Sequence, residues 1–139
     1  MNIIETYLAK AAGVAEAHAG DDLSCKVSYV AAHDVTAPIA IKMFREIGVS
    51  KVFDPDRVVL IVDHIYPAAT EKARNSVWAM DDFAKEFGVH LYQRGEGVIH
   101  QLMYETVSYT HLSIMWARSA AATPSRWSII FCLDAIWPL

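Results

Sequence analysis

Cysteine is scarce in this chain, and the scarcity excludes two kinds of small protein. Its 139 residues contain only Cys25 and Cys132, so there is neither a disulfide framework nor a CxxC pair. A disulfide-stapled secreted domain and a CxxC redox or zinc site are both excluded. We therefore expect a reducing compartment, the cytoplasm.

Long apolar runs and excess positive charge are also lacking. No run of 18 apolar residues could cross a membrane. Residues 1–10 include Glu5 and lack the basic stretch and apolar core of a secretory signal. The net charge of −4 gives no electrostatic reason to expect nucleic acid or an anionic membrane as a partner. With 54% hydrophobic residues, the chain is expected to form one modest globular domain.

Charge is distributed unevenly along the chain. Residues 107–139 carry only three of the 28 charged side chains but three of the four tryptophans. The apolar residues of this segment follow no sustained period, so we expect no further strand or helix of a regular fold there. Residues 1–106 and 107–139 are accordingly treated as separate regions.

Residues 1–106 alternate between helix and strand patterns. Asn2 and Glu5 form a capping-box pattern before a helix that Gly13 ends, and Thr36 and Thr70 are predicted to begin two more helices. Strands are predicted at Cys25–Val30, Val58–Val62 and Val89–Tyr92. Alternation of this kind predicts an α/β fold, a three-layer α/β/α arrangement with a mostly parallel sheet.

Apolar spacing predicts which face of each later helix is buried. The helix after Thr36 has one stripe at Ala40, Met43, Phe44 and Ile47, and the helix after Thr70 has one at Ala73, Val77, Met80, Ala84 and Phe87. We expect both stripes to pack against the sheet.

Polar, titratable residues are predicted at the ends of three strands. They are His33-Asp34, Asp63-His64 and His100-Gln101. In an open α/β sheet the carboxyl ends of the strands are where ligands bind, so these groups could meet in one cleft. A carboxylate bonded to an imidazole fixes the tautomer of the ring and favours its protonated form, which suits a general acid. The pattern indicates a small-molecule site built from histidine and carboxylate.

Each of these residues also has a structural interpretation. Asp34 could cap the following helix, and His33 and His100 could be ordinary loop histidines. Three further histidines, His18, His90 and His111, are interpreted as surface or loop residues. Cys25 is interpreted as a small core residue.

Three motifs in order carry a family resemblance. Ala32–Pro38 (AHDVTAP) resembles the HDVTGP segment of isopropylmalate dehydratase and homoaconitase large subunits, in the aconitase family. Val59–His64 (VLIVDH) and Gly95–Gln101 (GEGVIHQ) resemble two later segments of the same proteins, with similar spacing. The resemblance covers about residues 1–106.

The resemblance implies a hydro-lyase that removes and re-adds water on a hydroxy-dicarboxylate, of the kind used in leucine biosynthesis. It implies a [4Fe-4S] cluster that holds the leaving hydroxyl, and a small subunit as partner. Carried over by motif, Asp63, His64 and His100 would be catalytic and His33 would bind substrate. Homoaconitase and dimethylmalate dehydratase large subunits remain open, because Ala37 stands where the family usually has glycine.

The chain departs from the family after Glu105. It lacks the DSHT motif and the three cluster cysteines of the family, so we expect an incomplete domain that binds no cluster and is inactive alone. Val107–Leu112 (VSYTHL) resembles the translation of an adapter used for sequencing libraries. We therefore expect residues 107–139 to be non-homologous, an artefact or a disordered tail.

Two other classes of function stay open at this point. The cluster of His33, Asp34, Asp63, His64 and His100 could hold a divalent metal for hydrolysis, although no tight ligand spacing is present. Alternatively, the tryptophan-rich tail could dock a partner, which would make the chain a non-catalytic binding module.

Overall fold

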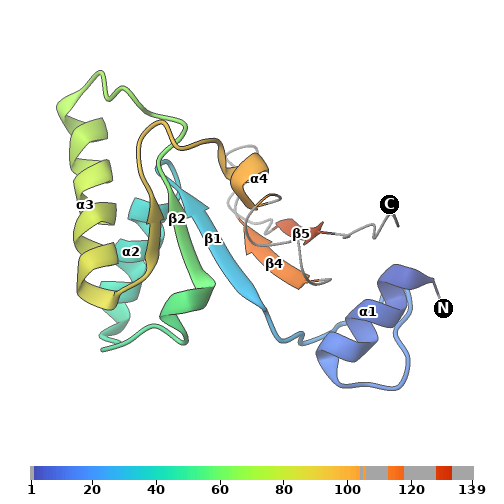
Figure 1. Cartoon of the computed structure of the whole chain (residues 1–139). Helices are drawn as coiled ribbons and strands as arrows, with labels where there is room; N and C mark the ends of the chain where they lie inside the picture. The colour runs from blue at the N-terminus through green and yellow to red at the C-terminus, as the bar shows by residue number, and fades with distance from the viewer. Residues whose placement is uncertain (1, 104, 106–112, 118–127, 133–139) are drawn as a thin grey trace.

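The computed structural model describes residues 2–103, 105, 113–117 and 128–132, the last two ranges as backbone only. Figure 1 shows its helices and strands, with one twisted sheet at the centre. The elements in order are α1 (Ile3–Ala12), β1 (Tyr29–His33), α2 (Ala37–Ile47), the 3-10 helix η1 (Pro55–Arg57), β2 (Val58–Ile61), α3 (Glu71–Phe87), β3 (His90–Tyr92), α4 (Ile99–Leu102), β4 (Ser113–Ala117) and β5 (Ser128–Cys132).

The sheet has five strands in the order β3-β2-β1-β4-β5. The first four are parallel, and only β5 is antiparallel, to β4. The expected α/β class with a mostly parallel sheet is therefore confirmed. The chain runs outward from β1 to β3 and then crosses through α4 to β4 on the far side of β1. This reversal makes the carboxyl end of β1 a topological switch point, the place where open α/β sheets bind ligands.

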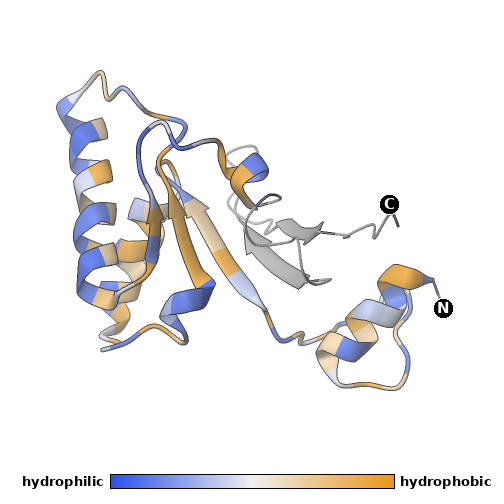
Figure 2. Ribbon diagram, viewed as in Figure 1, coloured by the Kyte–Doolittle hydropathy of each residue, from blue (hydrophilic) through white to orange (hydrophobic). Residues whose placement is uncertain are grey.

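Helices cover both faces of the sheet. Val58, Leu60 and Val62 face α2 and α3, and they form a core cluster with Ile41, Val77, Met80 and Phe83. Val59 and Ile61 face the other way and pack with Ile99, Leu102 and Met103 at α4. All four residues of β2 are buried, as expected of a central strand covered on both faces. Figure 2 shows the hydrophobic β2 beside α3, whose ribbon is largely hydrophilic.

The helix ends follow the sequence signals. Asn2 and Glu5 make both hydrogen bonds of a capping box at the start of α1. The Thr70 side chain accepts a hydrogen bond from the Ala73 N–H at the start of α3. Thr36 is the N-cap residue of α2, but its side chain makes no capping hydrogen bond. Each of these three helices ends at a glycine in the left-handed region, as predicted.

Two expectations for the early elements are wrong. The strand expected at Cys25–Val30 instead spans Tyr29–His33, and Cys25 lies in the preceding loop, where its thiol donates to the Leu8 carbonyl over 3.8 Å. The stripe expected to be buried on α2 is mostly exposed, because Ile41 and half-buried Phe44 face the core while Ala40, Met43 and Ile47 face outward. On α3 the expected face is correct, and Phe83 joins it.

The segment after residue 106 holds strands where none was expected. The backbone of β4 pairs in parallel with β1, and β5 pairs with β4. SIMWA and SIIFC are runs of five residues, and such short runs carry no period that separates a strand from other structure. The rest of 107–139, including His111, lies outside the described residues, so the artefact or disorder of this segment stays a prediction. None of the helices in the described part of the chain has the length and apolarity to cross a bilayer.

Candidate active site

The turns after β1 and β2 bring four titratable side chains together. These are His33, Asp34, Asp63 and His64. Because β1 and β2 are parallel, with His33 paired to Ile61, both turns lie at the same edge of the sheet. Two of the three predicted strand-end sites therefore converge, as the sequence indicated.

His33 is the last residue of β1 and is only 1% exposed. Its Nδ1 accepts a hydrogen bond from the Val35 N–H at 3.3 Å. A neutral imidazole that accepts at Nδ1 carries its proton on Nε2. That Nε2 is buried and has no hydrogen-bond partner in the described part of the chain. His33 is thus a buried donor, suited to an oxygen of a ligand, and the interpretation as an ordinary loop histidine is wrong.

The surroundings of His33 keep it neutral. Burial lowers the pKa of His33 below its ordinary value, and the neighbouring His64 and, more weakly, His100 lower it further. The carboxylates of Asp63 and Asp34 act in the opposite direction without reversing the result. At neutral pH, His33 is therefore an uncharged ring whose Nε2–H is available to an acceptor.

Asp63 and His64 form a close pair after β2. The Nδ1 of His64 lies 2.5 Å from Oδ1 of Asp63, whose other oxygen accepts the N–H of Ile99 at 2.7 Å. The Asp63 side chain is 2% exposed, whereas that of His64 is 37% exposed. With Nδ1 engaged by Asp63, Nε2 of His64 is left for a ligand. A carboxylate behind an imidazole in this way is the arrangement of a general acid or base.

The two imidazoles lie face to face. The ring centroids of His33 and His64 are 4.0 Å apart and their planes differ by 18°. A buried neutral imidazole and a more exposed one therefore stand side by side at the end of the sheet. Such a pair can hold one polar group of a small molecule and deliver a proton next to it.

His100 was expected at the end of a strand, and this expectation is wrong. It is an exposed residue of the short helix α4. It is nevertheless close enough to act electrostatically on His33. The Asp63–Ile99 hydrogen bond ties the start of α4 to the pair and brings His100 to the same edge. His18 and His90 are exposed and outside the cluster, as expected.

Sequence reasoning missed the backbone donors and the part played by Asp34. The carboxylate of Asp34 accepts hydrogen bonds from the N–H groups of His64 and Ile65 in the turn after β2. The interpretation of Asp34 as a cap of α2 is therefore wrong. The adjacent His-Asp and Asp-His dipeptides were the only signal of this contact, since backbone N–H groups leave no trace in a sequence.

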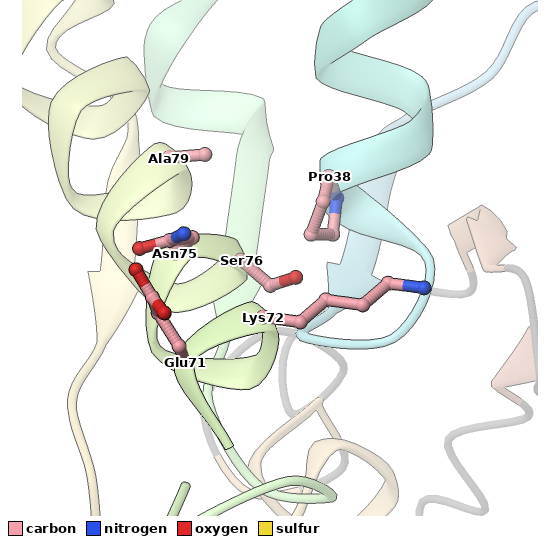
Figure 3. Close-up of a pocket in the computed structure, with 6 residues that line it drawn as sticks. All are labelled: Pro38, Glu71, Lys72, Asn75, Ser76 and Ala79. Carbon is pink, nitrogen blue, oxygen red and sulfur yellow. The ribbon is translucent and has the colours of Figure 1, made fainter.

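A separate hollow lies beside the first turns of α2 and α3. It is lined by Pro38, Glu71, Lys72, Asn75, Ser76 and Ala79. Figure 3 shows Lys72 extending along it toward α2, with Glu71 pointing away. None of the four clustered residues lines it, so this hollow is not the candidate site.

The same sequence aligns with one protein family over most of its length. The aconitase family (aconitate hydratase) matches residues 3–125. The chain belongs to the aconitase family. The family match therefore runs past residue 106, into the segment that holds β4, while the domain boundary at 106 stays a prediction.

Several curated relatives are 3-isopropylmalate dehydratase large subunits. The 3-isopropylmalate dehydratase large subunit of Desulfatibacillum aliphaticivorans is 46% identical over 107 residues, which is 76% of this chain and 26% of that protein. The corresponding protein of Aquifex aeolicus is 38% identical over 106 residues, 76% of this chain and 24% of that protein. The 3-isopropylmalate dehydratase large subunit 1 of Pyrococcus furiosus is 41% identical over 107 residues, which is 76% of this chain and 25% of that protein. The chain thus spans about a quarter of the length of these relatives.

The cysteines of this chain do not fit an iron–sulfur cluster. A cubane with one open iron needs three thiolates, and the sequence contains two cysteines. Cys25 lies in the loop after α1 and is absent from the cluster of His33, Asp34, Asp63 and His64.

Proposed function

We propose that this chain supplies the acid–base residues of a hydro-lyase of the isopropylmalate dehydratase type, and that it is inactive by itself. The substrate would be a hydroxy-dicarboxylate of the kind used in leucine biosynthesis, and the partners would include a small subunit. The single observation that carries the proposal is the stacked His33–His64 pair backed by Asp63. The family membership supports the class of reaction.

Each side chain of the site has a separate chemical role in this proposal. His33 donates its Nε2 hydrogen to a carboxylate or hydroxyl oxygen of the substrate and so orients it. In its doubly protonated form, His64 gives the proton on its Nε2 to the leaving hydroxyl as the C–O bond breaks, the hydroxyl departs as water, and the ring is left as the Nδ1–H tautomer held by Asp63. Asp63 remains a carboxylate and holds the ring. The proton on the neighbouring carbon is taken by a base outside the described residues.

His100 has a supporting part in the proposal. It stands on α4, which begins at the Asp63–Ile99 hydrogen bond. From there it belongs to the same acid–base network and can return a proton to His64 between turnovers.

A chimera tests this function. Residues 1–106 would replace the matching segment of the Desulfatibacillum aliphaticivorans large subunit, which shares 46% identity with this chain. With its small subunit and after anaerobic iron–sulfur reconstitution, the chimera is expected to dehydrate 3-isopropylmalate in preference to homologous hydroxy acids. The unmodified 139-residue chain is the control and should show no activity. A chimera that binds its cluster but is inactive on 3-isopropylmalate, homocitrate and dimethylmalate would contradict the proposal.

One rival function has an observation in its favour. His33, Asp34, Asp63 and His64 each offer a ligand atom, and these atoms lie within 4.8 Å of one another, as a divalent-metal hydrolase would require. However, the carboxylate oxygens of Asp34 and Asp63 already accept backbone and imidazole hydrogen bonds. Metal analysis of the purified chain decides between them, because stoichiometric zinc retained through dialysis would favour the hydrolase.

A further inference from the structure

Asp34 is a buried charged residue with no part in the chemistry proposed above. It is 1% exposed and lies directly after β1. A buried carboxylate is costly unless hydrogen-bond donors surround it. The donors here come from the neighbouring turn: the N–H of His64 approaches both carboxylate oxygens at 3.1 Å, and the N–H of Ile65 lies 2.9 Å from one of them.

These hydrogen bonds join the turns after two adjacent strands. They fix the position of the His64 backbone. The side chain of His64 contacts two partners. One partner is the carboxylate of Asp63, 2.5 Å from Nδ1, and the other is the face of the His33 ring, 4.0 Å from the His64 ring. The ring is joined to this backbone through a single Cβ atom, so the position of the His64 backbone decides whether the ring can meet both partners.

The carboxylate of Asp34 is not itself placed to exchange a proton with either ring. Its Oδ1 lies 3.9 Å from Nδ1 of His33 and 3.9 Å from Nδ1 of His64, beyond hydrogen-bond distance. Its hydrogen bonds go to backbone N–H groups that carry no proton chemistry. Apart from its electrostatic effect on His33, Asp34 therefore acts on the site through the position of His64.

We infer that Asp34 is a positioning residue, which clamps the turn after β2 so that the His64 imidazole stays stacked on His33 with Nδ1 directed at Asp63. This role extends the proposed function, since the position of His64 matters for catalysis only if His64 is the acid. The geometry of the clamp stands independently of that reaction.

The substitution Asp34→Asn tests the clamp with little change of shape. An asparagine offers one acceptor oxygen and one NH₂ donor, so it cannot accept from two N–H groups through two oxygens. If that oxygen takes the place of the one that accepts from both N–H groups, the NH₂ stands where the other oxygen was and meets the His64 N–H donor to donor, which weakens the clamp. Asp54→Asn is the matched control, because Asp54 also accepts a backbone N–H, that of Asp56 at 3.1 Å, but at the opposite end of β2.

The measurement is NMR on the complete 139-residue chain. In the parent, scalar couplings across hydrogen bonds are expected from the Asp34 side-chain carboxyl carbon to the His64 and Ile65 amide nitrogens. The His64 ring is expected as the Nδ1–H tautomer. In Asp34→Asn, the amide exchange of His64 and Ile65 should quicken at least tenfold and His64 should become a mixture of tautomers, while Asp54→Asn leaves both unchanged.

Two results would overturn the inference. The first is an Asp34→Asn chain in which His64 keeps its single tautomer and its ring contact with His33. The second is the absence of the couplings in the parent, which decides the matter even if Asp34→Asn does not fold, just as their presence supports the clamp. Failure here leaves the activity of the chimera untouched, so the two proposals fail separately.

Discussion

The imidazole of His33 lies almost entirely out of water, so its protonation is linked to folding. Burial lowers its pKa in the folded chain below the unfolded value of about 6.5. Below that pH the unfolded chain binds more protons than the folded chain, and stability falls as protons are added. The contribution of His33 is therefore complete above about pH 6.5 and is lost as the pH falls from there toward the folded pKa.

This linkage gives a prediction for His33→Gln. The free energy of unfolding in urea, measured between pH 5 and pH 8, should rise with pH in the parent. The rise should be smaller in His33→Gln, because glutamine does not titrate. His90→Gln, at an exposed position on β3, should keep the parent slope. Equal slopes in the parent and His33→Gln would show that His33 is not the group held neutral.

The sequence indicated which residues form the candidate site, but not where each of them lies in the fold. The sequence identified His33, Asp63 and His64, because acids and histidines directly after apolar strands are unusual. It could not show that His33 ends β1 and is buried, since Cys25–Val30 and Tyr29–His33 are similarly apolar. Nor could it show that Asp34 binds the turn after β2, because that contact spans about thirty residues of chain.

At the scale of the element, the two glycines before α4 differ in how much space a side chain would have at their positions. Gly97 has φ +153°, and a Cβ added there would lie 2.9 Å from Cγ of Leu102, a buried residue of α4. Gly95 has φ +84°, and a Cβ there would meet nothing within 4 Å. The Gly-Glu-Gly motif thus allows α4, which carries His100, to lie against the turn before it.

Substituting the two glycines separates backbone strain from crowding. Each alanine strains a left-handed backbone at a cost of about 1–3 kcal/mol. Gly97→Ala should in addition displace Leu102 and change the NMR signals of His100, whereas Gly95→Ala should leave those signals in place. Identical His100 signals in both variants would contradict the close packing of Gly97 on α4.

Helix α2 shows where periodicity is insufficient. Its sequence holds two apolar faces, one with Ile41 and Phe44 and another with Ile39, Met43 and Ile47. The spacing of either suits a buried stripe. The structure buries the first and exposes the second, with Met43 52% exposed. By contrast, the strand Val58–Ile61 was predictable because every residue of it is apolar and both faces are covered.

At the scale of the whole molecule, the chain forms a sheet with its candidate site at one edge. The four clustered side chains lie beside the switch point between β1 and β4. This placement follows from topology, which short apolar runs such as SIMWA did not predict. The class of the fold was predictable from the alternation of helix and strand signals, whereas the order of strands was not.

In the proposed function, the chain contributes part of a site. It spans about a quarter of the curated relatives it matches, and its two cysteines are too few for a cubane. The exposed apolar face of α2 and the partly exposed ring of His64 are features of a surface that further chain can cover. We propose that the acid of this site is His64, whose imidazole is partly exposed.

The most direct test of that claim is the turnover number of the chimera with His64→Gln. Glutamine can hydrogen bond but cannot deliver a proton, so kcat for 3-isopropylmalate should fall by about 10²–10⁴ with little change in KM. His90→Gln in the same chimera should retain the parent rate, and all three proteins should hold equal iron. A His64→Gln chimera that keeps kcat within about threefold of the parent would contradict general acid catalysis by His64.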